Sequence, residues 1–279
     1  MNEIYAIDPQ APEDLKDIKA MLSQFGFENG RFIAAIPTEW INLLNEHVQH
    51  LHGFDRQRFI RLLVLHKDAL LNVSEDYRIT KSWIENLATI KNTSRSINRV
   101  LTKNPNPYSF ESLHNFLWTN DEVNKSRGAH ISMSTEAYRK AIKPLAQHSS
   151  EIHMADRYFQ LRRKEYGQID FGRQSVLREL LIEAEKNNRC EVFKIHLKRQ
   201  DYLKETQIED DLNEVGTQAN LKRLQIEYTL NNDMIHGRYI FSIKGGLQFD
   251  QGFEPHLHKK NHVHWLSKAE LEPIIKFYS

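Results

Sequence analysis

The hydrophobic pattern of the chain changes about halfway along its length. Residues 38–48, 56–73 and 80–91 place apolar side chains three and four positions apart, the spacing that gathers them on one face of an α-helix. The short apolar run Phe32–Ile36 fits a strand or a buried loop equally well, because so short a run shows no period. We therefore predict a mostly α-helical N-terminal module over residues 1–128.

Beyond about residue 150, strand and helix patterns alternate. Short runs alternate apolar and polar residues, as half-buried strands do, and the longer runs between them have helical spacing. The expected strands are residues 152–155, 190–197, 225–230, 238–243, 247–249 and 261–265, and the expected helices begin near residues 134, 174, 208 and 267. Such alternation is typical of an α/β domain. We predict an α/β domain with a mixed sheet and flanking helices over residues 129–279, joined to the first module by a polar linker at residues 119–133.

The stretch Tyr228–Phe253 combines strand pattern with site chemistry. Gly245 and Gly246 are expected to adopt positive φ in the tight turn of a β-hairpin. His236 and Arg238 are two positions apart, so on a strand they project from one face. We predict a hairpin that presents this His/Arg pair at its mouth.

The same stretch carries a family resemblance. His-x-Arg-Tyr followed by a hydrophobic strand and Gly-Gly resembles a degenerate half-motif of the phospholipase D superfamily. It is nearer to the phospholipase D-like domain found at the C-terminus of MIT-domain proteins and to related bacterial phospholipase D-like proteins. The active superfamily motif is His-x-Lys, then four residues, then Asp; here His236 matches, Arg238 replaces the Lys and Ile243 replaces the Asp. The resemblance spans about residues 130–279 and implies a phospholipase D-like fold with a degenerate active site.

The resemblance also implies roles for single residues. In an active phospholipase D-like site one histidine attacks phosphorus and a second protonates the leaving group. His236 is therefore the candidate catalytic residue, and the guanidinium of Arg238 is suited to bidentate binding of phosphate oxygens. A complete site would need a homodimer or a nonstandard partner such as His196. The superfamily often pairs two halves, which favours a homodimer.

Further candidates lie near the ends of predicted strands, where open α/β sheets bind ligands. Asp156 and His196 are so placed, and Asp156 is suited to orient the His/Arg pair. The candidate ligand-binding residues are Arg238, Asp156, His196 and Lys244. The structural alternative is that His236 and Arg238 bond to backbone carbonyls, and that Asp156 is a helix cap or a surface ion pair of small energetic value.

A histidine-rich run near residue 260 suggests a metal site at first sight. It contains His256, His258, His262 and His264. His-x-His on a strand places both imidazoles on one face, which zinc can use. However, no carboxylate or cysteine with ligand spacing joins the run, and Lys259 and Lys260 lie in its middle, where their charge repels a cation. We therefore predict an exposed loop and strand without a metal, and no cofactor.

Composition narrows the class of protein. The chain has 279 residues, 40% hydrophobic and 27% charged, as in a soluble globular protein. A net charge of +1 argues against a strongly basic nucleic-acid binder, but not against a local basic face. Cys190 is the single cysteine, which excludes an internal disulfide. We expect no secretory signal at the acidic N-terminus and no membrane span, and therefore a cytoplasmic protein.

Two clusters of basic residues are candidates for that local basic face. The first comprises Arg157, Arg162, Arg163 and Lys164, with Tyr158, Phe159 and Tyr166 interleaved, and the second comprises Lys194, Lys198 and Arg199. Aromatic and basic side chains together are typical of a groove that binds single-stranded nucleic acid. The alternative is a solvated charged face.

Several catalytic motifs are absent, which removes NTPases, simple dinucleotide enzymes, α/β-hydrolases and zincin proteases. The resemblance points to a phosphate- or nucleic-acid-binding protein with a degenerate site, in a prokaryotic antiviral defence or mobile-element system. Two alternatives stay open. One is an active phosphodiesterase or nuclease with His236 as nucleophile. The other is a scaffold subunit whose N-terminal helices dock a protein partner.

Overall fold

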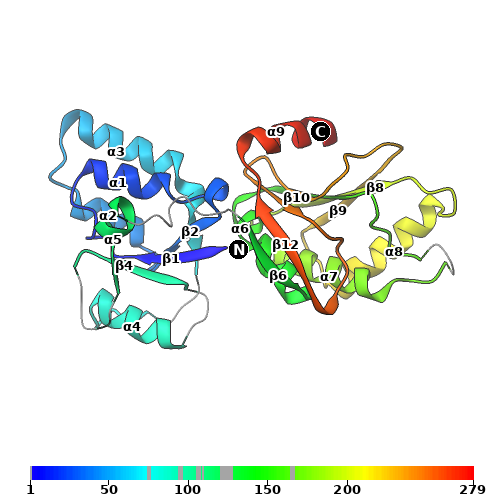
Figure 1. Ribbon diagram of the computed structural model, residues 1–279, viewed down its shortest axis with the longest axis horizontal. Helices are drawn as coiled ribbons and strands as arrows, with labels where there is room; N and C mark the ends of the chain where they lie inside the picture. Colours follow the sequence, from blue (N-terminus) through cyan, green and yellow to red (C-terminus); the bar gives the residue numbers. More distant parts are fainter. Residues whose placement is uncertain are drawn as a thin grey trace. The chain divides into compact units, whose positions relative to one another are not determined.

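The computed structural model describes residues 2–73, 77–93, 97–104, 108, 110–119, 128–163 and 167–279, without the side chains of residues 92 and 93. The chain divides into two compact units, Asn2–Ser126 and Arg127–Ser279. Each unit has its own sheet, and each is described by itself (Figure 1).

The N-terminal unit is built on a five-stranded parallel sheet of order β3-β2-β1-β4-β5. Its strands are β1 (Glu3–Ile7), β2 (Arg31–Ala35), β3 (Leu70–Asn72), β4 (Arg99–Thr102) and β5 (Glu111–Ser112). Its helices are α1 (Leu15–Ser23), α2 (Trp40–His47), α3 (Gly53–Leu65), α4 (Trp83–Thr93) and α5 (Leu113–Trp118), with short 3-10 turns at Phe27–Asn29 and Lys67–Ala69.

The prediction of a mostly helical N-terminal module is therefore wrong. Strands of two to five residues are too short to show a period, and β1 and β2 are buried on both faces. A strand inside a parallel sheet reads as a continuous apolar run rather than an alternating one. The run Phe32–Ile36 is such a strand. All of it belongs to β2 except Ile36. Tyr5, Trp40 and Phe116 pack in the core beside this sheet.

The C-terminal unit has a seven-stranded sheet of order β6-β12-β11-β10-β7-β8-β9. Its strands are β6 (Gly128–Met133), β7 (Glu151–Asp156), β8 (Val192–Lys198), β9 (Gln225–Asn231), β10 (Arg238–Phe241), β11 (Gly246–Phe249) and β12 (His256–Trp265). Its helices are α6 (Thr135–His148), α7 (Phe171–Lys186), α8 (Glu205–Gln218) and α9 (Lys268–Tyr278). The predicted α/β class with a mixed sheet and flanking helices is confirmed.

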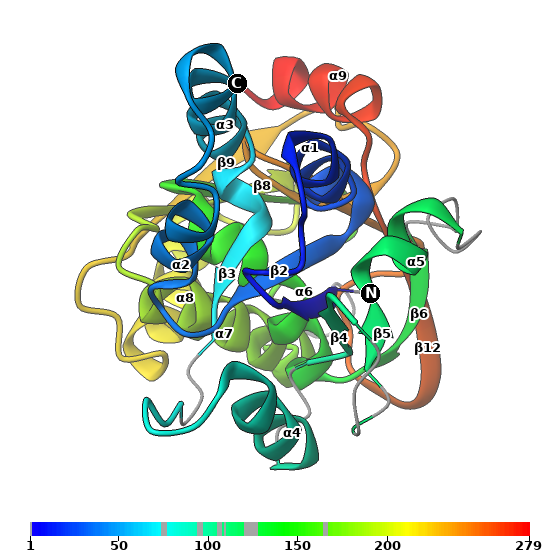
Figure 2. The ribbon, with the colours of Figure 1, turned by 90° about the vertical axis from the view of Figure 1, so that its left-hand side faces the viewer.

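Two halves of different character make up this sheet. β7, β8 and β9 are parallel and are connected through α7 and α8, whereas β10, β11, β12 and β6 continue the sheet in antiparallel pairs. Helix α9 lies on one side of the sheet and α7 and α8 lie on the other (Figures 1 and 2). Leu271, Ile274 and Tyr278 of α9 pack on Tyr239 and Phe241 of β10.

Details of two predicted connections differ from expectation. The predicted linker contains β6, which begins at Gly128, while residues 120–127 lie outside the described part of the chain. Gly245 and Gly246 are not among the described glycines with positive φ. Gly246 serves packing instead, because a Cβ there would stand 2.8 Å from Leu271 Cδ1 and 2.9 Å from Leu266 Cδ1. A glycine thus lets α9 approach the hairpin closely.

Cys190 is fully buried just before β8, and burial raises the pKa of its thiol to about 12. No described helix is long and apolar enough to cross a membrane.

The N-terminus of α9 provides a test of local stability. Ser267 Oγ accepts a hydrogen bond from the backbone N–H of Glu270, and Glu270 Oε2 accepts one from the backbone N–H of Ser267 at 2.7 Å. We expect Ser267→Ala to lower the free energy of unfolding by about 1 kcal/mol, because it removes the cap. The exposed Lys276→Ala on the same helix should change it by less than about 0.5 kcal/mol. Urea denaturation of both variants checks this, and equal effects would contradict the cap's role.

Candidate functional site

Asp156 and Arg238 meet where the two halves of the C-terminal sheet join. Asp156 is the last residue of β7, Arg238 is the first of β10, and the antiparallel register pairs them directly. Arg238 Nε lies 3.8 Å from Asp156 Oδ2. Since this is the carboxyl end of β7, the pair stands where ligands of open α/β sheets bind.

The carboxyl group of Asp156 is 2% exposed. Its burial raises its pKa, while a hydrogen bond from the backbone N–H of Tyr158 to Oδ1 at 2.8 Å and the charge of Arg238 act in the opposite direction. A buried acid of shifted pKa beside a cation is a common feature of functional sites, although structural ion pairs share it.

Two contacts hold the guanidinium of Arg238. Nη1 donates to the backbone carbonyl of Asp250 at 2.9 Å, and the group lies over the Tyr158 ring, 5.2 Å from its centroid. Nε is buried and has no hydrogen-bond partner among the described residues. Its 3.8 Å separation from Asp156 is too long for a hydrogen bond. Arg238 therefore keeps donor capacity that the protein does not use.

A cavity of about 400 Å³ opens in front of this pair. The charged or polar residues that line it are Asp156, Tyr158, Arg173, Arg238, Asp250, Gln251, Glu254, His256 and Lys259. The described lining thus carries three cationic side chains and three carboxylates. Arg173 is already occupied, because it forms an ion pair with Glu254 and donates to the carbonyl of Tyr158 at 3.0 Å. Arg238 and Lys259 are the cations with the fewest such contacts.

Part of this lining, including Arg173, Gln251 and Glu254, was not predicted from the sequence. Arg173 comes from the first turn of α7, where the Asp170 side chain accepts from the backbone N–H of Arg173 and caps the helix. The segment after β11 is fixed by Asn261, which is fully buried. Its Oδ1 accepts from the backbone N–H of Gln251 at 2.9 Å, and its Nδ2 donates to the Gln251 carbonyl at 2.9 Å.

His236 lies outside β10 and is exposed, so the prediction that it shares a strand face with Arg238 is wrong. The chain bends there, and Gly237 separates the bend from the strand. The His236 ring meets the Tyr158 ring edge to face, with centroids 6.3 Å apart. His236 is therefore near the Arg238 cavity but is not among its lining residues.

His196 lies on the opposite face of the sheet from Asp156. It pairs with Ala155, and adjacent residues of a strand point to opposite faces. The His196 ring stacks on His153, with Nε2 2.9 Å from His153 Nδ1, and its Nδ1 lies 2.8 Å from Thr229 Oγ1. Among the described residues the ring contacts of His196 are with His153, Phe241 and Tyr278 and not with His236, so a role as partner of His236 stays a prediction.

Lys244 lies at the other end of β10 from Arg238, in the turn that leads to β11. Beside it, Ile243, the residue in the motif's Asp position, is 78% exposed. Lys244 lines a separate cavity of about 550 Å³ together with Ser149, Glu151, His153, Arg189, Lys194 and Ser242, among others. The strand length thus separates Lys244 from the Asp156–Arg238 pair.

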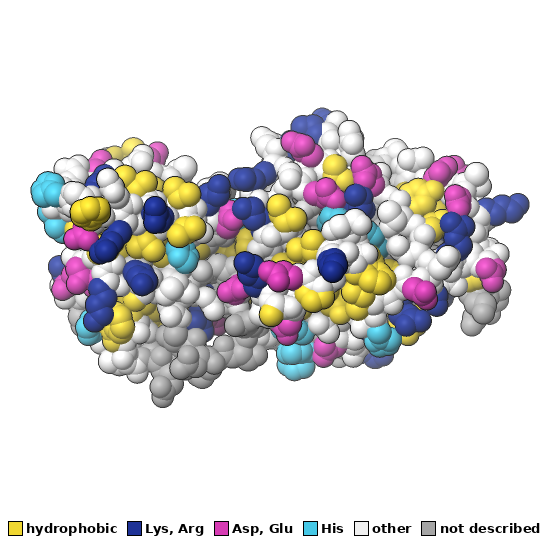
Figure 3. Space-filling model, turned by 90° about the horizontal axis from the view of Figure 1, so that it is seen from above, with side chains coloured by type: hydrophobic (Ala, Val, Ile, Leu, Met, Phe, Trp, Pro, Cys, Tyr) yellow, Lys and Arg dark blue, Asp and Glu magenta, His cyan; other side chains and the backbone are white. Residues whose placement is uncertain are grey.

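The expected basic face is largely neutralised by acidic neighbours. Arg162 binds both carboxylate oxygens of Asp211 at 2.7 and 2.8 Å, and Lys194 pairs with Glu151 and Glu227. Basic and acidic side chains are interspersed over the face shown in Figure 3. Lys164 and Tyr166, expected in the same face, lie outside the described residues.

The N-terminal unit has cavities that sequence reasoning missed. One of about 580 Å³ is lined by Asp8, His47 and Trp83 among others, and an adjoining one of about 560 Å³ shares Leu43 and Tyr77 with it. Asp8 directly follows β1, and the strand order reverses beside β1. Such a reversal is a second place where open α/β sheets accept ligands.

Comparison with known proteins identifies no family for this chain. No family model matches the chain, and no curated protein is similar to it. Among solved structures, TrmBL2, an archaeal chromatin protein described as showing a novel mode of DNA binding, aligns with 85% of this chain and 66% of its own, at 10% sequence identity and a TM-score of 0.29. The aligned part thus spans somewhat less than two thirds of that protein. A likeness at this level supports no argument about fold or function.

The buried histidine pair predicts a pH dependence of stability. Burial lowers the pKa of His196 to about 3 in the folded state and also lowers that of His153, whereas in the unfolded chain both have an ordinary value near 6.5. Below about pH 6.5 the unfolded state therefore binds more protons, and stability falls as the pH falls, by up to about 1.4 kcal/mol per pH unit for each such proton.

We expect His196→Gln to be less stable than wild type at pH 7 but to lose less stability between about pH 7 and pH 5, because one of these protons is gone. Urea denaturation across this range measures both slopes. His258→Gln, at an exposed histidine, should keep the wild-type slope. An unchanged slope in His196→Gln would show that His196 already titrates normally in the folded protein.

Proposed function

We propose that the C-terminal unit is a phospholipase D-like binding module that holds a phosphate group in the Asp156–Arg238 cavity without hydrolysing it, and that nucleic acid supplies the phosphate. The proposal rests on the resemblance of the His-x-Arg-Tyr stretch and on the geometry at Arg238. A place in prokaryotic antiviral defence belongs to the same proposal and comes from the resemblance.

The observation that carries the proposal is the unused donor capacity of Arg238. Its guanidinium lines a 400 Å³ cavity, makes one described hydrogen bond through Nη1, and has a buried Nε without a partner. Since Nε is buried, a ligand in the cavity meets the other N–H groups of the guanidinium, of which only Nη1 makes a hydrogen bond among the described residues. Phosphate accepts two parallel N–H bonds from one guanidinium.

The neighbours of Arg238 suit a bound anion. Tyr158 packs against the guanidinium on one side, and Asp156 stands behind it as a buried counter-charge. Lys259 is exposed at the cavity and adds a second cation. The three carboxylates of the lining repel an anion, so the contacts with Arg238 and Lys259 have to outweigh this repulsion.

Binding is better supported than hydrolysis. The candidate nucleophile His236 is exposed and outside the cavity lining, and the histidine that lines the cavity is His256. The position of the motif's Asp is taken by the exposed Ile243 at the far end of β10. An active phosphodiesterase is therefore the alternative function, and the experiment below distinguishes it from binding alone.

Binding to labelled single- and double-stranded DNA and RNA across a salt series tests the proposal. We expect Arg238→Ala to weaken binding by roughly 10- to 100-fold, the effect of losing a charged hydrogen-bonded contact, and to reduce the slope of log affinity against log salt by about 1. Arg238→Lys should fall between Ala and wild type, because it keeps the charge but loses the bidentate geometry.

The matched control is Arg178→Ala, at a partly exposed arginine of α7 that pairs with the adjacent Glu179 and does not line the cavity. Its affinity should stay within about twofold of wild type. Thermal unfolding of each variant confirms that it is folded. Equal binding by wild type and Arg238→Ala would refute the phosphate role of this cavity. Cleavage products that form with wild type and are absent with His236→Ala would instead support the phosphodiesterase.

A further inference from the structure

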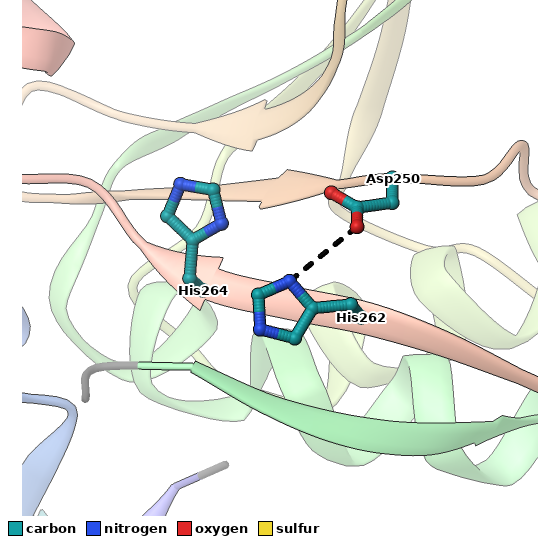
Figure 4. A group of neighbouring side chains, drawn as sticks. All are labelled: Asp250, His262 and His264. Carbon is teal, nitrogen blue, oxygen red and sulfur yellow. Dashed lines mark ion pairs between the residues drawn. The ribbon is translucent and has the colours of Figure 1, made fainter.

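Asp250, His262 and His264 converge on one face of the C-terminal sheet (Figure 4). Each offers one ligand atom, and the three atoms all lie within 4.8 Å of one another. We propose that these three side chains bind a divalent transition-metal ion, of which zinc fits their chemistry best. The proposal does not depend on phosphate binding at Arg238.

The sheet register explains why the three residues meet. Gln248 of β11 pairs with His264 of β12, so Asp250, two residues further along, comes opposite His262. The backbone N–H of Asp250 donates to the His262 carbonyl at 3.0 Å, which fixes this pairing. His262 and His264 are two apart on one strand and therefore project from the same face. Asp250 Oδ2 lies 3.4 Å from His262 Nδ1.

The ligand set and its spacing suit zinc. Two imidazoles and one carboxylate form a known zinc ligand set that leaves a fourth position open. Tetrahedral bonds of about 2.0–2.2 Å hold ligand atoms roughly 3.3–3.5 Å apart, so a pair at the 4.8 Å limit would have to close by about 1.3–1.5 Å. Such a change needs only side-chain rotation, because Asp250 is exposed and both histidines are partly exposed.

The neighbouring strand β6 leaves room for these rings and brings a further histidine near them. Gly128 of β6 pairs with His264, and a Cβ at this position would stand 2.6 Å from His262 Nε2. With His262 in this conformation, only glycine fits at position 128. His130, also on β6, pairs with His262, and their ring centroids are 5.0 Å apart.

The structure removes the two objections that the sequence raised against a metal here. Asp250, which directly follows β11, supplies the missing carboxylate. Its distance from the histidines along the chain did not reveal this contact. The lysines have other positions: Lys259 lines the Arg238 cavity, and Lys260 is exposed, so that its long side chain can keep the ammonium in solvent. Of the four histidines in the run, His256 and His258 are not part of the cluster.

The full-length protein, freed of any polyhistidine tag and of metal by chelation and dialysis, provides the test. We expect one Zn²⁺ per chain by calorimetry, and visible absorption bands of a four- or five-coordinate site when Co²⁺ is added. Zn²⁺ should raise the melting temperature, because it binds only the folded arrangement. Affinity should fall on acidification, since histidine ligands must lose their protons to bind.

The variants decide which residues bind. His262→Ala, His264→Ala and Asp250→Asn should each weaken Zn²⁺ binding by on the order of tenfold or more, a loss at least as large as outer-shell changes cause. His258→Ala is the matched control, an exposed histidine of the same strand, and should bind like wild type. Absence of Zn²⁺ and Co²⁺ binding by folded wild-type protein would overturn the proposal, as would equal binding by the three variants and wild type.

Failure of this site leaves the phosphate proposal untouched, because the Arg238 assay needs no metal. Conversely, loss of nucleic-acid binding in Arg238→Ala with Zn²⁺ binding intact would show that the metal site does not need Arg238, although Asp250 belongs to the cluster and also lines the cavity.

Discussion

The antiparallel pairing of β7 with β10 is the contact on which the C-terminal unit depends. On one side of it are the parallel strands β8 and β9, and on the other are the antiparallel strands β11, β12 and β6. The two halves meet in the sheet only along this pair. The join also brings Asp156 opposite Arg238, so the residues that hold the fold together are the residues that shape the cavity. The Asp156 carboxylate can be buried here because the Arg238 guanidinium and the backbone N–H of Tyr158 lie beside it.

Strand β7 separates two chemical environments. Asp156 faces the cavity at the carboxyl end of β7, whereas His153 on the other face is stacked on His196 and on Phe241 of β10. The first environment keeps a charged pair with donor capacity left over, and the second keeps its imidazoles neutral by burial. Alternation along a strand is enough to produce this difference over a few residues.

The sequence predicted the C-terminal unit well because its elements are long enough to show a period. The Ser267–Glu270 capping box, the hairpin strands and the strand ending at Asp156 are local signals. What it missed depends on contacts between distant segments. The strands of the N-terminal sheet are too short and too buried to alternate. Arg238 and Lys244 lie at opposite ends of β10 although only five residues separate them in the chain. Asp250 joins His262 only through the register of β11 and β12.

Cys190 gives this unit an internal reporter. Its thiol is buried and its pKa is raised to about 12, so at neutral pH almost none of it is the reactive thiolate. A thiol reagent can modify the chain only after the segment before β8 has opened. Because Cys190 is the single cysteine, the rate of its alkylation follows the opening of this segment directly, without any engineered label.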